Sequence, residues 1–225
     1  MKNKYVIFPI VMGTLALLCF LAVAFFMAFS VQPLWGRLMV LLLPAIILYA
    51  VACLSAKGKI SSRKTVILTV VLTIVLLLVS IFYILLLAVW TATTVTTDVR
   101  YYSKAYAQID DEDGVEGIFP ASIPTDAKDV VFHYNPQFLQ GGEVFELSYI
   151  VPDDMLSEWT NRLEKKAEWI GPDEEWHRLN NWRSHNERNA IRYHLHWDGG
   201  FNHGEMSYVL VESSTNRITF YYTDW

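Results

Sequence analysis

One stretch of this 225-residue chain decides its fold. Residues 65–93 are TVILTVVLTIVLLLVSIFYILLLAVWTAT, a run without a charged side chain or a histidine. A helix needs about 20 apolar residues to cross a bilayer, so this run predicts a transmembrane helix that is long enough to tilt or to extend beyond the hydrocarbon. All 23 acidic side chains of the protein follow it, from Asp98 onward, and none precedes it.

Two further apolar runs lie on the N-terminal side of this stretch, at about Tyr5–Val31 and Leu38–Ala56. Neither contains Asp, Glu, Lys, Arg or His. A charged side chain at the centre of a membrane helix costs about 2.5–3.5 kcal/mol on insertion scales, so its absence favours two more membrane crossings. Pro44 lies inside the second run and predicts a kink there.

The basic side chains predict the orientation of the three crossings. Cytoplasmic loops of membrane proteins are enriched in Lys and Arg. With three crossings, the N-terminus and the second loop lie on one side and carry Lys2, Lys4, Lys57, Lys59, Arg63 and Lys64. The first loop carries only Arg37, so we expect the N-terminus in the cytoplasm and the C-terminal domain outside. The alternative for the first run is a cleaved signal peptide, which would leave the C-terminal domain outside as well.

Composition and charge exclude several classes of protein. A hydrophobic content of 53% excludes a single soluble domain, a disordered chain and a collagen-like repeat. From Asp98 onward there are 11 basic and 23 acidic side chains, which gives a formal charge of −12 and argues against nucleic acid as a partner. Both cysteines, Cys19 and Cys53, lie in membrane runs, so the exported part has no disulfide.

The chain is therefore expected to have three parts: a membrane anchor over residues 1–93, a linker over 94–117 and an exported domain over 118–225. The linker begins with threonines and then collects Asp110, Asp111, Glu112, Asp113 and Glu116. An EF-hand loop would need a ligand at position 109 and a glutamate at position 120, where Ile and Pro stand. We interpret this segment as a solvated acidic stalk.

The exported domain is predicted to be α+β. Five segments rich in β-branched and aromatic residues predict strands, namely Val130–Tyr134, Glu143–Val151, Ala190–Asp198, Glu205–Glu212 and Arg217–Trp225. Apolar residues at helical spacing predict one helix that starts near Asp153, runs to Ile170 and stops at Gly171. The order β-β-α-β-β-β favours one antiparallel sheet of about five strands with one covering helix. ESSTNR, residues 212–217, predicts a hairpin turn.

One cluster of residues suggests a metal site. Alternation places His194, His196 and Asp198 on one face of a strand, with His203 nearby, and such side chains can bind a transition metal. The string HLHWDGG resembles the H-x-H-x-D-H motif of the metallo-β-lactamase fold, although Gly199 stands where the final histidine belongs. The competing interpretation is the ordinary solvent face of a strand.

Tryptophan is unusually frequent in the exported part, which holds six of the eight tryptophans. Most are expected to pack in the core of a small domain without disulfides. Trp176 and Trp182 lie in a polar segment and are candidates for exposed anchors that contact a partner or a glycan. No nucleophile elbow, zinc-protease motif or phosphate-binding glycine loop is found in the sequence.

Several segments of the exported part resemble a domain found in membrane proteins and lipoproteins of Gram-positive bacteria. The residues that carry the resemblance are Phe119-Pro120, Ile123-Pro124, FLQGG at 138–142 and the terminal pattern Tyr221-x-x-Asp-Trp. It covers about the last 108 residues and not the membrane helices. The domain has no known activity, so the resemblance implies a location outside the cell rather than a function.

These observations predict a multi-pass protein of the cell membrane with a non-enzymatic domain outside, which binds, senses or assists a partner. The expected partners are the lipid bilayer and another membrane or cell-surface protein, without nucleic acid and without a cofactor. The alternative is a surface metal-dependent hydrolase that uses the His194, His196 and Asp198 cluster.

Overall fold

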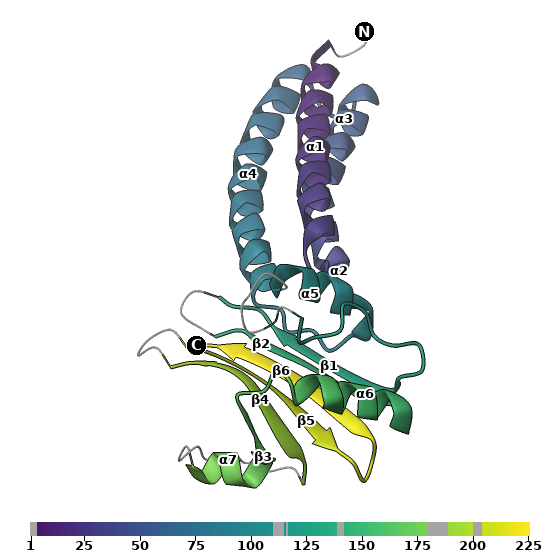
Figure 1. Ribbon diagram of the computed structural model, residues 1–225. Coiled ribbons are helices and arrows are strands. Elements are labelled where there is room, and N and C mark those ends of the chain that lie inside the picture. Colours follow the sequence, from purple (N-terminus) through teal and green to yellow (C-terminus); the bar gives the residue numbers. More distant parts are fainter. Residues whose placement is uncertain (1–3, 110–114, 116, 139–141, 180–188, 200–203) are drawn as a thin grey trace. The chain divides into compact units, whose positions relative to one another are not determined.

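The computed structural model describes residues 4–109, 115, 117–138, 142–179, 189–199 and 204–225 (Figure 1). The chain divides into two compact units, residues 1–91 and 92–225. The first consists of apolar helices and the second contains a six-stranded antiparallel sheet with helices. The predicted fold class is therefore confirmed, with six strands instead of about five.

Three stretches of the first unit are helical, long enough and apolar enough to cross a membrane: Ile7–Ala28, Trp35–Ala56 and Ser62–Ala92. Their elements are η1 (Lys4–Val6), α1 (Ile7–Phe29), α2 (Trp35–Leu38), η2 (Met39–Leu42), α3 (Leu43–Ala56) and α4 (Ser62–Ala92). Many large apolar side chains on them are exposed, such as Phe26 at 73% and Ile7 at 67%. Apolar side chains are stable in such positions when lipid surrounds them.

The irregularity expected at Pro44 is found on its N-terminal side. Residues Met39–Leu42 form a 3₁₀ turn, and the regular helix α3 begins at Leu43 with the proline in its first turn. Proline lacks an N–H group, and its ring clashes with the carbonyl of the residue four positions earlier. The backbone before Pro44 therefore tightens into 3₁₀ geometry, and the helix then continues to Ala56.

Small and hydroxylated residues hold the helices of the first unit together. Gly13 of α1 lets the Tyr49 ring of α3 approach, because a Cβ atom on Gly13 would lie 3.3 Å from that ring. The Tyr49 hydroxyl is 2.9 Å from Thr14 Oγ1. Between α3 and α4, Ser55 Oγ lies 2.8 Å from Thr65 Oγ1. Small residues and interhelical hydrogen bonds commonly pair helices in lipid, where the hydrophobic effect is weak.

The described residues of the second unit form ten elements. They are η3 (Val99–Tyr101), α5 (Tyr102–Ile109), β1 (Lys128–Asn135), β2 (Val144–Ile150), α6 (Asp153–Leu163), β3 (Trp169–Pro172), α7 (Asp173–Leu179), β4 (Ile191–Asp198), β5 (Glu205–Glu212) and β6 (Arg217–Asp224). The strand order in the sheet is β1-β2-β6-β5-β4-β3, and every neighbouring pair is antiparallel. The predicted hairpin joins β5 to β6, with Asn216 in the left-handed conformation (φ 54°).

The sixth strand lies where the predicted helix was expected to continue. Helix α6 ends at Leu163, and Trp169–Pro172 form the edge strand β3 against β4. The Glu168 N–H also donates to the His194 carbonyl at 2.8 Å. The apolar residues Ala167 and Ile170 continue the helical spacing, but hydrogen bonds to β4 and the following Gly171 and Pro172 favour extended backbone there.

The predicted stalk is wrong over residues 96–109, which belong to the second unit. Thr96 exchanges two backbone hydrogen bonds of 2.9 Å with Tyr134 of β1. Helix α5 then buries Tyr102, Ala105 and Ile109 almost completely, so these side chains form part of the core. The acidic residues of the predicted stalk, at 110–113 and 116, lie outside the described residues. A polar and threonine-rich composition concealed three apolar positions at helical spacing.

Aromatic side chains fill the core between one face of the sheet and helices α5 and α6. We call this the core face, and it carries Phe132, Tyr134, Phe145, Leu147, Tyr149, Val209, Ile218, Phe220 and Tyr222. Tyr102 of α5 contacts the rings of Phe132 and Phe145, with ring centroids 5.5 and 5.6 Å apart. Trp159 of α6 meets Phe220 edge-on at 4.9 Å. Such aromatic pairs stabilise a core beyond their buried area.

Candidate binding face of the sheet

The opposite face of the sheet carries a row of polar and aromatic side chains that crosses five strands. The register pairs His133 of β1 with Glu146 of β2, Glu146 with Tyr221 of β6, Tyr221 with Tyr208 of β5, and Tyr208 with His194 of β4. Directly paired residues lie on the same face of a sheet, close enough for their side chains to touch. We call the face that carries this row the polar face.

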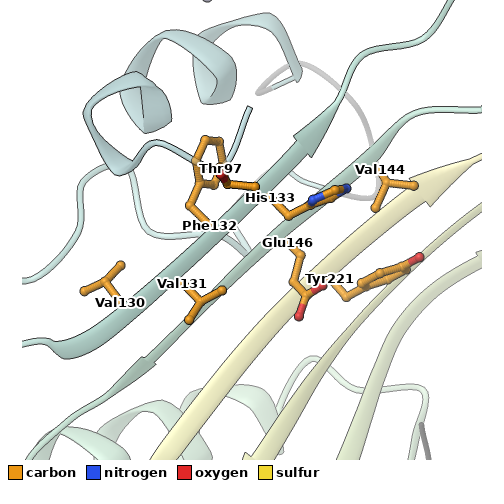
Figure 2. A pocket seen from close by; sticks show the side chains of 8 residues that line it. All are labelled: Thr97, Val130, Val131, Phe132, His133, Val144, Glu146 and Tyr221. Carbon is orange, nitrogen blue, oxygen red and sulfur yellow. The ribbon is translucent and has the colours of Figure 1, made fainter. Parts of the chain in front are cut away.

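A shallow, open groove of about 560 Å³ lies over the β1 end of this row. Figure 2 shows Glu146 and Tyr221 next to one another on adjacent strands, with Val131 and His133 on β1 beside them. The groove is lined by Thr97, Val130, Val131, Phe132, His133, Val144, Glu146 and Tyr221. Val131 is 50% exposed although it is a large apolar residue in a strand. The groove thus combines apolar walls with one carboxylate, one imidazole and one phenol.

Two stacked tyrosines form the middle of the row. The rings of Tyr208 and Tyr221 lie 4.8 Å apart and are nearly parallel, with 22° between their planes. Burial raises the pKa of both hydroxyls, and Glu146 raises each further by electrostatic repulsion of the phenolate. Both side chains are therefore neutral phenols at physiological pH and offer flat, uncharged aromatic surfaces.

A buried arginine closes the row at the β4 end. Arg192 is 1% exposed and donates through Nε to Asp173 Oδ1 of α7 at 2.7 Å, while its Nη2 lies 2.6 Å from the same oxygen. The guanidinium lies over the rings of Tyr208 and Trp176, with Cζ 3.6 and 4.3 Å from their centroids. It also donates through Nη2 to His177 Nε2 at 3.3 Å. Ion pairing and cation–π contact offset part of the cost of burying this charge, whose Nη1 has no hydrogen-bond partner among the described residues.

His194 is held neutral beside this arginine. Burial, together with the positive charge of Arg192 and the nearby His196, lowers the pKa of its imidazole to about 4. Its ring stacks on Trp176 with centroids 5.2 Å apart. The side chain is buried, and its Nδ1 has no hydrogen-bond partner among the described residues. His194 therefore serves as a packed aromatic ring near neutral pH.

The three described members of the predicted metal cluster, His194, His196 and Asp198, do not share one face, because a β-bulge interrupts β4. His194 pairs with Tyr208 while His196 pairs with Ser207, so Leu195 is an extra residue on its strand. An extra residue reverses the alternation that follows it. His194 consequently lies on the polar face, whereas His196 and Asp198 lie on the core-face side.

The partners of these residues differ accordingly. His196 Nε2 lies 2.6 Å from Glu205 Oε1, and Asp198 is exposed. His203 lies outside the described residues. Within the part of the chain that the structure describes, no group of three or more His, Cys, Asp and Glu side chains is gathered as a metal ion requires.

Trp176 is not the exposed anchor that we considered. Only 5% of it is exposed, and its ring packs between Arg192, His194 and Trp197. The sequence of helix α7, which carries Trp176, is mostly polar and therefore suggested an exposed position. In the structure the Trp176 side chain packs against the sheet. The second candidate, Trp182, lies outside the described residues.

The groove residues were not identified from the sequence, although a signal for one of them exists. Phe145, Leu147 and Tyr149 occupy alternate positions in β2. Alternation therefore places the intervening Glu146 on the opposite face of the sheet. Nothing in the sequence, however, reveals that His133 and Tyr221 lie beside Glu146. That neighbourhood depends on the pairing of β2 with both β1 and β6, which are far apart in the chain.

No family model matches this chain, and neither does any curated protein or solved structure.

Proposed function

We propose that this protein is a non-enzymatic binding module at the outer surface of the cell membrane, and that its partner contacts the polar face of the sheet. The single observation that carries the proposal is the groove over Val131, His133, Glu146 and Tyr221. It joins exposed apolar surface with a carboxylate and a tyrosine, and aromatic residues surrounded by polar groups are typical of binding surfaces.

The charge distribution supports the outer location of the sheet domain. Six basic side chains lie at the N-terminus and in the second loop, against one in the first loop. The positive-inside rule then leaves the N-terminus in the cytoplasm and the domain after α4 outside. The bilayer is the first partner of such a chain, and another membrane or cell-surface protein is the expected second.

The chemistry of the polar face supports binding rather than catalysis. His194 and the two stacked tyrosines are held in their neutral forms, so they are poor proton donors or acceptors for acid–base chemistry near neutral pH. The hydrolase alternative depended on His194, His196 and Asp198 sharing one face, and the bulge at Leu195 separates them. The binding module is therefore the better supported of the two functions.

Topology is tested first. Alkaline phosphatase, which is active only outside the cytoplasm, is fused after Trp225, and a second copy is inserted at Gly58 in the loop between α3 and α4. We expect activity from the first fusion and none from the second. Activity from the insertion at Gly58 alone would reverse the orientation and remove the proposal.

The binding surface is tested by a photo-cross-linking amino acid placed in the full-length protein in its own membrane. One variant carries it at Val131 in the groove, and the matched control carries it at Glu158, an exposed residue of α6. We expect one discrete adduct with another protein from position 131 and none from position 158. Equal labelling at both positions, or no adduct at 131, would contradict the polar face as the binding surface.

A further inference from the structure

A partly open crevice of about 230 Å³ lies between the apolar helices of the first unit. Helix α1, the η2–α3 segment and helix α4 each supply part of its lining. Nine of the twelve described residues that line it are apolar, and the other three are Cys19, Thr73 and Ser80. Because none of these twelve residues is charged, the crevice suits a neutral and mainly hydrocarbon ligand.

One hydroxyl of this lining differs from the comparable hydroxyls of the helices. Threonines inside helices commonly donate to the backbone carbonyl four residues earlier. Four of the five threonines in α1 and α4 do so, at 2.7–3.1 Å, namely Thr14, Thr65, Thr69 and Thr91. The fifth is Thr73, whose Oγ1 is buried and has no hydrogen-bond partner among the described residues. An unpaired hydroxyl is unfavourable in apolar surroundings, so Thr73 favours a ligand that brings an acceptor oxygen.

The depth of Thr73 in the membrane restricts where that oxygen comes from. At a rise of about 1.5 Å per residue, Thr73 lies about 6 Å from the midpoint of α4 between Lys64 and Trp90. Basic residues and tryptophans lie near the headgroups, so this midpoint is close to the centre of the bilayer. The ester oxygens of phospholipids lie at the edges of the hydrocarbon core, about 15 Å from its centre. They are too far away to accept from Thr73, whereas a compound dissolved in the hydrocarbon can place an oxygen there.

We propose that this crevice binds a neutral, lipid-soluble carbonyl compound of the isoprenoid quinone class, with one ring carbonyl accepting a hydrogen bond from Thr73 Oγ1. Such a compound carries acceptor oxygens and no ionised headgroup, which matches the uncharged lining. A dry apolar cavity of about 150 Å³ takes up benzene, so about 230 Å³ accommodates a larger ring system. The isoprenoid tail leaves through the open side into the lipid. The site lies in the membrane helices and is independent of the function proposed for the polar face.

The ligand class is tested with the full-length protein in phosphatidylcholine nanodiscs. The probe is tritiated 2-methyl-3-geranyl-1,4-naphthoquinone, and the matched control is 2-methyl-3-geranylnaphthalene, which has nearly the same shape and no oxygen. A scintillation proximity assay measures the binding of each, and empty nanodiscs correct for partition into lipid. We expect saturable binding of the quinone, about fivefold tighter than that of the hydrocarbon, since one buried hydrogen bond distinguishes the two ligands.

Variants of the crevice sharpen the assignment. Thr73→Val removes the hydroxyl at nearly constant shape, so the quinone should lose its advantage and bind as weakly as the hydrocarbon. Thr69→Val is the matched control, because it makes the same change one turn earlier on α4, where the hydroxyl already donates to the Thr65 carbonyl at 2.7 Å. It should leave the preference for the quinone unchanged. Ala16→Phe places a large ring in the lining and should reduce the binding of both ligands.

Three results would overturn the inference. One is the absence of saturable quinone binding above that of empty nanodiscs. Another is equal binding of the two ligands to the natural protein, which would make the crevice a place for any hydrocarbon, such as a phospholipid acyl chain. The third is an equal loss of the quinone preference in Thr73→Val and Thr69→Val, which would assign it to the packing of α4 and not to a hydrogen bond from Thr73. The two ligands are compared on the natural protein, so this test does not depend on the folding of any variant.

Discussion

The two faces of the sheet use the same strands for opposite purposes. Phe220 and Tyr221 are consecutive residues of β6, yet Phe220 is completely buried among Phe119, Tyr149 and Trp159, whereas Tyr221 lines the groove. The core face is aromatic and covered by two helices. The polar face has charged groups, and those that are buried are paired. One strand can therefore line a packed core and a polar surface together, because successive side chains point in opposite directions.

The largest expected effect is on the core face. Phe220→Ala removes a ring that is 0% exposed, so we expect the free energy of unfolding to fall by about 4 kcal/mol from lost burial and a remaining cavity. Tyr221→Ala, the adjacent control, should cost about 1 kcal/mol because it loses mainly the stack on Tyr208. Denaturant unfolding of the full-length protein in detergent micelles, followed by tryptophan fluorescence, measures both. Equal losses would show that the two faces do not differ as described.

The second prediction concerns the buried ion pair on the polar face. Asp173→Ala leaves the Arg192 guanidinium buried without its carboxylate, and we expect a loss of about 3 kcal/mol in the free energy of unfolding. Replacing both partners by leucine should restore much of that loss, since the uncompensated charge is then absent. The same unfolding measurement applies. A double variant as unstable as Asp173→Ala would mean that packing around α7, and not charge, determines stability there.

The third prediction is a dependence of stability on pH that comes from His194. Its pKa is about 4 in the folded protein and about 6.5 when unfolded, so between these values the unfolded state binds a proton that the folded state does not. The contribution is fully present above pH 6.5 and is lost as the pH falls towards 4. We expect a loss of about 2 kcal/mol between pH 7 and pH 5.

The variant His194→Phe keeps a ring against Trp176 and cannot take up the proton. Its free energy of unfolding should therefore fall less than that of the natural protein over the same pH interval. An equal fall in both proteins would assign the pH dependence to other groups.

Much of the fold follows from local pattern. The three apolar runs, the strands β1, β2, β4, β5 and β6, and the hairpin at Asn216 were predicted close to their observed bounds. These elements are indicated by the length of an apolar run, by the alternation of apolar and polar residues, and by turn-forming residues. All three signals depend only on residues close together in the sequence. The errors lie elsewhere, in β3, in α5 and in the faces of β4 beyond Leu195, where distant partners decide the structure.

The candidate site shows the same division. Alternation in β2 is sufficient to place Glu146 on the face away from Phe145 and Leu147. The prediction that His194 and His196 share a face was wrong, because one inserted residue, Leu195, shifts His196 to the other face. A bulge has no reliable sequence signature, since its position depends on which residues of β4 and β5 hydrogen-bond. The burial of Trp176 was hidden for a similar reason, because it depends on α7 packing against Arg192 and His194.

By itself, the sequence determined that this chain has three helices able to cross a bilayer and an acidic α+β domain behind them, because hydrophobicity and charge act through composition and local periodicity. The tertiary structure alone decided that Thr96 joins the sheet, that residues 169–172 form an edge strand, and that Glu146 and Tyr221 meet in a groove. The physical reason is that backbone hydrogen bonds between strands are indifferent to side-chain identity. The register of β1, β2 and β6 is determined by the burial of the aromatic side chains of the core face, which requires the complete tertiary structure.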